Sequence, residues 1–367
     1  GYTDLMEEAY GSDPLDDTDS PGAYGDFVFL VPYNEAPDPT LDTLVFSTNL
    51  QMADVYFLID GTPSLYDEIA TLVSELTTTV IPGIQGEIAD SWFGVGAFQD
   101  CASTSCANNL AVIQMITSDS TAVSTALGGL TSGLCGGREP YRAALYATAS
   151  GDLAPFSAWP GVHPTTWTCT PPGSVGWPCF RPRAVPIIVH LGDEDFDSGA
   201  TGCSPTITHT QAVDAINAIE GKYIGINAGT GSGGSHDDMV ATATDTGSVD
   251  SSGSPLVYDT SSTTTLGTQI VDAVNQLATA VPIRVDAIAH DDPSDMTDAV
   301  ATFIDRIETN TSGASIWDPI MEEMRLCTPA STIPLRFGAT IEVIGDEHTP
   351  LDERTIYFIV PPEIPGG

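Results

Sequence analysis

The chain has 367 residues with 50 acidic and 10 basic side chains, which gives a formal net charge of −40 at pH 7. The imbalance reflects a shortage of basic residues, and Lys222 is the only lysine. So few cations exclude a basic nucleic-acid-binding surface and charge-driven docking on an anionic membrane. With 41 % hydrophobic residues the chain can still bury a core, so its charge does not indicate disorder. We expect partners that are neutral, basic or bridged by divalent cations.

The apolar runs and the cysteines indicate a folded, exported protein. No apolar run approaches the ~18 residues of a membrane span, so we expect no membrane insertion. The lack of an initiator Met predicts that Gly1 follows a processing point. Cysteines in Ser/Thr/Pro/Gly-rich loops favour an oxidising compartment. We expect two close pairs and three candidates for an odd thiol, namely Cys101 with Cys106, Cys169 with Cys179, and then Cys135, Cys203 and Cys327.

Residues 1–24 are acidic and rich in turn-forming residues, with too little apolar surface to fold alone. If Gly1 occupies the sharp-turn position of a calcium loop, Asp4 and Glu7 fall at loop positions nine and twelve. The segment resembles the thrombospondin type 3 calcium repeats of exported proteins, which would make Asp4 and Glu7 weak metal candidates. The alternative is an acidic tail or linker.

Segments at both ends of the chain predict a second, smaller β structure. Residues 26–32 form an apolar β run, residues 338–344 alternate apolar and polar side chains, and residues 355–361 form a further apolar run. We therefore expect residues 25–50 and 330–367 to build a small β-sheet or sandwich. Residues 51–310 would form a domain inserted into it, with 311–329 as a connector.

The inserted region alternates apolar strands with amphipathic helices. Residues 55–59 are apolar throughout, as in a strand buried on both faces of a parallel sheet. A helical stripe follows, made of Leu65, Ile69, Leu72, Leu76 and Val80. We expect Pro82 and Gly83 to stop that helix.

The remaining elements continue the alternation. Strands are expected at 92–98, 110–116, 185–191, 223–227 and 255–258, and helices near 120–130, 139–149, 209–220, 235–245 and 264–280. This pattern predicts an α/β fold with a doubly wound, mostly parallel sheet of Rossmann-like type. The Cys-, Pro- and Trp-rich stretch 151–183 interrupts it and is expected to be an ordered surface insertion.

Oxygen-bearing side chains follow the first strand of this region. Asp60, Thr62 and Ser64 occupy alternate positions of a tight turn just before a helix. Such a turn can aim one carboxylate and two hydroxyls at one point, as hard divalent cations require. Alternatively, Thr62 or Ser64 simply caps the helix.

Two further loops favour the metal interpretation. Asp193 follows the apolar run 186–189, and Glu139 lies in a Gly-Gly-Arg-Glu-Pro loop before a helix. Because ligands of open α/β sheets bind at the carboxyl ends of the strands, we expect both side chains to join Asp60. The donor set suits Mg²⁺, Ca²⁺ or Mn²⁺.

The sequences ADVYFLIDGTPS (53–64), WFGVGAFQD (92–100) and VPIIVHLGDEDF (185–196) resemble the von Willebrand factor A (vWA) domain and its metal-ion-dependent adhesion site. The resemblance implies that Asp60, Thr62, Ser64 and Asp193 are ligands. Glu139 resembles the loop glutamate of integrin β-subunit I-like domains. Pro63 and Gly192 depart from the common pattern. Gly192 does so because a threonine often stands at this position, before the aspartate.

The resemblance implies a non-enzymatic module that binds a protein ligand, which supplies a carboxylate to the metal. We expect an extracellular or cell-surface location, with a periplasmic or outer-membrane-associated one as a variant. The rival hypothesis is a structural subunit of a surface filament, layer or envelope complex, in which the metal only stabilises the fold. Such a subunit could also assemble with copies of itself.

Three other features are weaker. Residues 229–234 match a Gly-x-Gly-x-x-Gly nucleotide motif, but in a Gly/Ser-rich stretch that matches by chance. His190, inside an apolar strand, is expected to be a satisfied core residue. The acidic stretch 291–295 predicts a helix start capped by Ser294 or Asp295, or alternatively a second cation site.

Overall fold

The computed structural model describes residues 3–16, 18–32, 37–40, 42–45, 50–196, 200–229, 234–260, 265–280, 285–309, 314–319, 333–345 and 349–362. The chain forms two compact units. One consists of Asn49–Pro282, and the other of Gly1–Thr48 with Ile283–Gly367. None of the described helices has the length and apolar character needed to cross a membrane.

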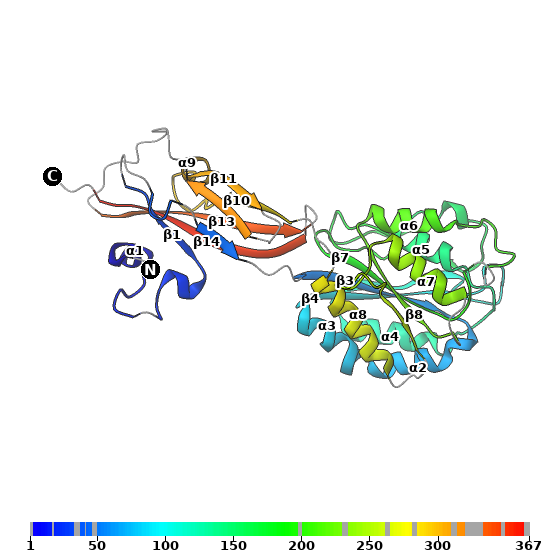
Figure 1. Ribbon diagram of the computed structural model, residues 1–367. Coiled ribbons are helices and arrows are strands. Elements are labelled where there is room, and N and C mark those ends of the chain that lie inside the picture. Colours follow the sequence, from blue (N-terminus) through cyan, green and yellow to red (C-terminus); the bar gives the residue numbers. More distant parts are fainter. Residues whose placement is uncertain are drawn as a thin grey trace. The chain divides into compact units, whose positions relative to one another are not determined.

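The unit Asn49–Pro282 is built on a seven-stranded sheet in the order β6-β5-β4-β3-β7-β8-β9 (Figure 1). Its strands are β3 (Met52–Asp60), β4 (Asp90–Phe98), β5 (Leu110–Thr117), β6 (Val162–His163), β7 (Val185–Gly192), β8 (Lys222–Asn227) and β9 (Val257–Asp259). β5 runs antiparallel to β4, whereas β3, β4, β7, β8 and β9 run parallel. The chain adds strands on one side of β3 and then on the other. This confirms the predicted doubly wound, mostly parallel α/β sheet.

Helices cover both faces of this sheet (Figure 1). On one face lie α2 (Tyr66–Glu75), α3 (Ile81–Glu87), α4 (Ser120–Leu130) and α8 (Leu266–Ala280). On the other lie α5 (Tyr141–Ser150), α6 (His209–Ala218) and α7 (Gly234–Asp245). With both faces covered, β3 and β7 are buried along almost their whole length, as their apolar sequences predict.

The first predicted helix extends further than expected. Its apolar stripe from Leu65 to Val80 is fully buried, as predicted. The predicted stop at Pro82 and Gly83 is wrong, because a π-helical turn (Leu76–Val80) leads directly into α3. Pro82 falls in the first turn of α3, directly after the π-helical turn, and the helix continues through it although proline has no N–H to donate to the preceding turn. Gly83 packs so closely on α8 that a Cβ would lie 2.8 Å from the Val271 side chain.

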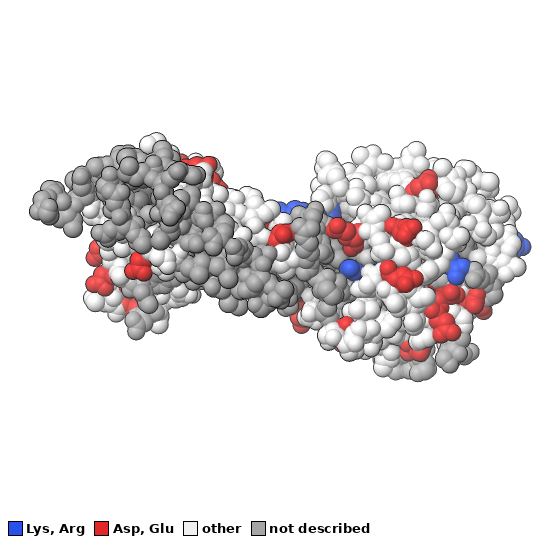
Figure 2. Space-filling model, turned by 45° about the horizontal axis from the view of Figure 1, so that its top comes forward, with Lys and Arg blue, Asp and Glu red and all other residues white. Residues whose placement is uncertain are grey.

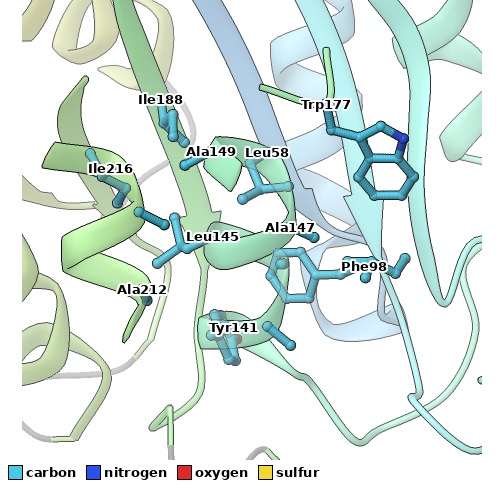
Figure 3. Packing of buried hydrophobic residues seen from close by; sticks show 14 of the residues in the cluster. Leu58, Phe98, Tyr141, Leu145, Ala147, Ala149, Trp177, Ile188, Ala212 and Ile216 are labelled. Carbon is cyan, nitrogen blue, oxygen red and sulfur yellow. The ribbon is translucent and has the colours of Figure 1, made fainter. Parts of the chain in front are cut away.

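The core between the sheet and α5 and α6 contains aromatic residues from the predicted insertion (Figure 3). Trp177, Phe156 and Phe180 from residues 151–183 are at most 1 % exposed and pack against strand residues such as Leu58. The stretch also holds the short 3₁₀ turn Ala154–Phe156 and β6. Trp177, Phe156 and Phe180 therefore belong to the core, whereas the stretch was expected to be a surface insertion.

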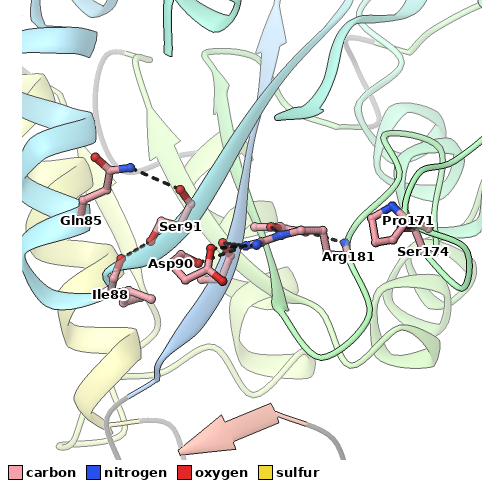
Figure 4. Close-up of polar contacts among 9 residues, drawn as sticks. Gln85, Ile88, Asp90, Ser91, Pro171, Ser174 and Arg181 are labelled. Carbon is pink, nitrogen blue, oxygen red and sulfur yellow. Dashed lines mark hydrogen bonds and ion pairs between the residues drawn. The ribbon is translucent and has the colours of Figure 1, made fainter. Parts of the chain in front are cut away.

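A buried ion-pair cluster joins the end of this stretch to the amino ends of β3 and β4 (Figure 4). Arg181 Nε lies 2.7 Å from Asp54 Oδ1, and its Nη1 lies 2.8 Å from Asp90 Oδ1. The guanidinium carbon also lies 4.2 Å from the centroid of the Trp92 ring. Because Arg181 is buried, these partners replace the water that its charge would otherwise bind.

The terminal unit contains two sheets. The first has the order β1-β14-β13-β10, with β1 (Phe27–Leu30), β14 (Thr349–Val360), β13 (Leu335–Gly345) and β10 (Val285–Asp291). The second has the order β11-β12-β2, with β11 (Ile304–Thr309), β12 (Ala314–Pro319) and β2 (Asp42–Val45). A short helix, α9 (Ala299–Phe303), precedes β11, and its Phe303 packs on Phe337 and Phe358. The two ends of the chain thus form one β structure, as predicted.

Two segment boundaries differ from the sequence-based ones. Residues 285–309, expected in the inserted domain, lie in the terminal unit because β10 pairs with β13 over seven residues. β12 falls within the expected connector 311–329, of which residues 311–313 and 320–329 lie outside the described residues. Near the start, α1 (Asp4–Tyr10) and the 3₁₀ turn Pro21–Tyr24 precede β1. Met6 packs with Val28 and Ile359, so this stretch is packed on the sheet.

Candidate metal centre

The turn after β3 holds three oxygen-bearing side chains in one group. Asp60 is the last residue of β3, and the backbone N–H of Thr62 donates to its Oδ1 at 2.9 Å. The hydroxyl oxygens of Thr62 and Ser64 lie 3.1 Å apart. Neither hydroxyl caps the 3₁₀ turn Pro63–Leu65 or α2, so the capping alternative is wrong. The two hydroxyls hydrogen-bond each other instead.

Glu139 and Asp193 meet Asp60 at this point. One carboxylate oxygen from each of the three residues lies within 4.8 Å of the others. The Ser64 side chain lowers the pKa of Asp193 and the Thr62 side chain lowers that of Glu139, each against the larger effect of burial, so both hydroxyls lie near these carboxylates. The structure therefore brings together all five residues of the predicted main site.

The sheet register explains the meeting of Asp60 and Asp193. β3 lies between β4 and β7, and Ile59 is level with Leu191 on β7. Asp60 is thus level with Gly192, and Asp193 is the first residue beyond it. Both carboxylates emerge at the carboxyl edge, where the sheet order reverses and neighbouring loops diverge.

Gln99 ties together the loops around these carboxylates. Its Nε2 donates to the carbonyl oxygens of Gly61 at 3.1 Å and Gly133 at 2.6 Å, and its Oε1 accepts from the N–H of Asn108 at 3.0 Å. The N–H of Cys135 donates to the same Gly61 carbonyl at 3.0 Å. The loop that follows β3 is therefore joined to the loop that leads to Glu139.

Two disulfides reinforce the same loops. Cys106 pairs with Cys135, just before the Glu139 loop, and Cys101 pairs with Cys203, beyond Asp193. The predicted pair Cys101 with Cys106 is wrong, because the β4–β5 connection lies beside two loops that are distant in sequence. Cys169 pairs with Cys179, as predicted. Cys327 lies outside the described residues.

Sequence reasoning missed Tyr141, whose hydroxyl lies at the centre of the site. It donates to Asp60 Oδ2 at 2.7 Å and lies 3.3 Å from Glu139 Oε2. It accepts from the backbone N–H groups of Asp193 at 3.2 Å and Glu194 at 3.0 Å. No sequence pattern separates this tyrosine from a core aromatic residue at the start of an amphipathic helix.

Burial perturbs the pKa values of all three carboxylates, and charge repulsion adds to it at Asp60 and Glu139. Burial, and next the charge of Glu139, raises the pKa of Asp60 well above its ordinary value. Burial, and next the charge of Asp193, raises the pKa of Glu139 to about 7. Burial also raises the pKa of Asp193. Carboxylates this close resist simultaneous ionisation unless a cation neutralises them.

The donor chemistry fits a divalent cation. All the candidate ligands are carboxylate or hydroxyl oxygens, which suit Mg²⁺, Ca²⁺ or Mn²⁺. Within the described part of the chain, the buried Oδ1 atom of Asp193 accepts no hydrogen bond. A buried carboxylate oxygen without a donor is costly, and a metal ion would satisfy it.

The other candidates do not form comparable sites. Asp4 and Glu7 lie on the first turn of α1, and among the described residues the only metal-sized group of acidic, His or Cys side chains is Asp60, Glu139 and Asp193. Residues 230–233 of the glycine motif lie outside the described residues. His190 is buried, and its Nδ1 lies 2.8 Å from the Tyr223 hydroxyl.

The acidic stretch 291–295 is a backbone-binding loop. Asp298 caps α9, so the predicted caps Ser294 and Asp295 are wrong. Asp295 instead accepts from the N–H groups of Thr297 at 3.0 Å and Gly338 at 2.9 Å.

Comparisons with known proteins add a limited similarity. No family model matches the chain, and comparison with curated proteins finds no match. A solved structure described as von Willebrand factor type A from Catenulispora acidiphila is 12 % identical, with a TM-score of 0.38 over 88 % of this chain and 74 % of that one.

Proposed function

We propose that the unit Asn49–Pro282 is a vWA-like module that binds a protein partner through a divalent cation. The ligands would be Asp60, Thr62, Ser64, Glu139 and Asp193. The observation that carries the proposal is the meeting of three carboxylates from three separate loops within 4.8 Å. Two hydroxyls from the turn after β3, 3.1 Å apart, lie near the same carboxylates. Such a set completes most of an octahedral shell and leaves a position for an outside oxygen.

The partner we propose supplies that oxygen from a carboxylate. The cation would reverse the local field at this edge and admit an acidic group to a strongly acidic protein. Figure 2 shows acidic side chains on the visible face with few basic ones between them. Arg138, next to Glu139, is 48 % exposed in its side chain and lies 4.0 Å from Asp100.

Binding, rather than catalysis, is the function we propose. The site offers charge and positioning, and His190, the buried histidine near it, has its pKa lowered to about 3 by burial and so stays neutral. Three disulfides are typical of an oxidising compartment. They support our proposal of an extracellular or cell-surface protein.

Isothermal titration calorimetry with MgCl₂, CaCl₂ and MnCl₂ tests the site. The unmodified protein should bind at least one cation at a single site, and Asp60→Asn and Glu139→Gln should abolish binding. Asp67→Asn, which removes an exposed carboxylate from the first turn of α2, is the charge-matched control. Thermal melts of each variant establish folding. Failure of the unmodified protein to bind any of the three cations overturns the proposal.

The alternative is a structural subunit of a surface assembly with a merely stabilising metal. Sedimentation velocity in EDTA and in Mg²⁺ separates the two. A structural subunit self-associates in both buffers, and its Asp60→Asn variant self-associates to the same extent. In a metal-dependent binding module, any association is lost in EDTA and in the Asp60→Asn variant.

A further inference from the structure

The Tyr141 hydroxyl has its hydrogen-bonding capacity fully used. A phenol offers one proton and accepts through its oxygen lone pairs. The N–H groups of Asp193 and Glu194 donate to the oxygen, and its proton is directed to Asp60 Oδ2, the nearer of two carboxylates at 2.7 Å. One buried atom therefore links β3, the start of α5 and the loop after β7.

The Tyr141 ring is held rigidly. It stacks on Phe196 with centroids 4.8 Å apart and meets Phe98 edge-on at 4.9 Å. A Cβ at Gly192 would lie 2.3 Å from Tyr141 Cε1, so β7 closes the remaining side. The side chain is 0 % exposed. The hydroxyl consequently cannot move away without repacking the core.

The hydrogen bond limits how Asp60 can bind a metal. Oδ1 accepts from the Thr62 N–H at 2.9 Å and Oδ2 from Tyr141. Each oxygen keeps a lone pair for a cation, but the two donors on opposite oxygens fix the plane of the carboxylate, so Asp60 cannot turn to present both oxygens to one ion. Mg²⁺ takes six ligands at about 2.0–2.1 Å, whereas Ca²⁺ takes 6–8 at about 2.3–2.6 Å and often uses bidentate carboxylates.

We propose that Tyr141 is a positioning residue that keeps Asp60 monodentate and the ligand loops close together, so that the site selects Mg²⁺ over Ca²⁺. The inference rests on the proposed cation site and adds to it the source of its selectivity. Tyr141 acts through Asp60 and the Asp193 loop and is not itself a ligand. A rigid, compact set of single oxygens penalises the larger cation, because the loops cannot move apart to admit further ligands.

The test compares Mg²⁺ and Ca²⁺ dissociation constants by calorimetry for the unmodified protein, Tyr141→Phe and Tyr223→Phe. Outer-shell partners typically change metal affinity by about 10–100-fold. We expect Tyr141→Phe to weaken Mg²⁺ binding at least about tenfold and Ca²⁺ binding much less. Tyr223→Phe removes another buried hydroxyl, bonded to His190 at 2.8 Å, and should leave the Mg²⁺/Ca²⁺ ratio unchanged.

Gly192→Ala supplies a second variant if Tyr141→Phe does not fold. It retains the hydroxyl but displaces the ring, and should shift the Mg²⁺/Ca²⁺ ratio in the same direction. If the Mg²⁺/Ca²⁺ ratio is unchanged in the folded variants, the inference about Tyr141 is overturned, but the proposed cation site is not. If the unmodified protein binds neither Mg²⁺ nor Ca²⁺, the inference fails together with its premise.

Discussion

Gly192 and Tyr141 are structurally interdependent, because any side chain at Gly192 would occupy the space of the Tyr141 ring, 2.3 Å from its Cε1. Glycine is required here by the close approach of a neighbour. The threonine that often precedes the aspartate in the vWA pattern cannot coexist with this ring. The departure at Gly192 is thus matched by a tyrosine hydroxyl that bonds Asp60 and the Asp193 loop.

Cation affinity should depend on pH. Burial and the neighbouring Asp193 raise the pKa of Glu139 to about 7, so protons compete with the cation below that value. We expect the apparent Mg²⁺ dissociation constant to rise by up to about tenfold per pH unit as pH falls from 8 to 6. Calorimetry at three pH values measures this. A constant affinity across that range would show that Glu139 is not a ligand.

Removal of the disulfide next to Glu139 should weaken cation binding. Cys106→Ser with Cys135→Ser removes a disulfide between cysteines 29 residues apart, which stabilises the fold by about 3–4 kcal/mol in the chain-entropy model. The double substitution also frees the loop that positions Glu139. We expect a lower melting temperature and about tenfold weaker Mg²⁺ binding.

Cys169→Ser with Cys179→Ser is the matched control for this disulfide. That pair closes a separation of 10 residues in the stretch 151–183 and touches none of the ligand loops. It should lower stability and leave Mg²⁺ affinity unchanged. Equal loss of affinity in both double variants would show a general loosening of the fold.

Divalent salts should stabilise the protein more than NaCl does at the same ionic strength. Both salts screen the repulsion of a chain with net charge −40, but only a bound cation adds stability through linkage to the folded state. Melting temperatures in MgCl₂ or CaCl₂ should exceed those in NaCl, and Asp60→Asn should remove most of the difference. Equal responses to both salts would reduce the charge to a solubility feature.

Arg181→Met should destabilise the protein by about 3–5 kcal/mol, because it leaves the buried Asp54 carboxylate without its cation. Burial already raises the pKa of Asp54 to about 6 despite Arg181. A raised carboxyl pKa means that the folded state holds its proton more tightly than the unfolded state. Stability is therefore lost as pH rises through that pKa.

The loss in Arg181→Met should consequently be larger at pH 8 than at pH 5, as measured by urea denaturation. Arg181→Lys, which keeps the charge but not the planar fork, should lose less at both pH values. An equal loss at pH 5 and pH 8 would show that packing on Trp92, rather than charge, is what Arg181 contributes.

The sequence predicts most of the strands and helices of Asn49–Pro282 because their signals are local. The apolar run 55–59 and the stripe from Leu65 to Val80 reflect burial at strand and helix spacing. Asp60, Thr62 and Ser64 are recognisable because the three positions are close in sequence and follow a buried strand. Asp193 is recognisable because it also follows a buried strand, and the carboxyl ends of parallel strands lie at one edge of the sheet.

Tertiary structure alone decided the features that join distant parts of the chain. Tyr141 and Asp60 are 81 residues apart, and Cys101 and Cys203 are 102 apart. Likewise β10 joins the terminal sheet through β13, and Pro82 continues a helix after a π turn. Local periodicity reports which face of an element is buried but not which neighbour buries it. The sequence by itself therefore determined the α/β sheet and the ligand loops, whereas long-range packing decided how those loops are held together.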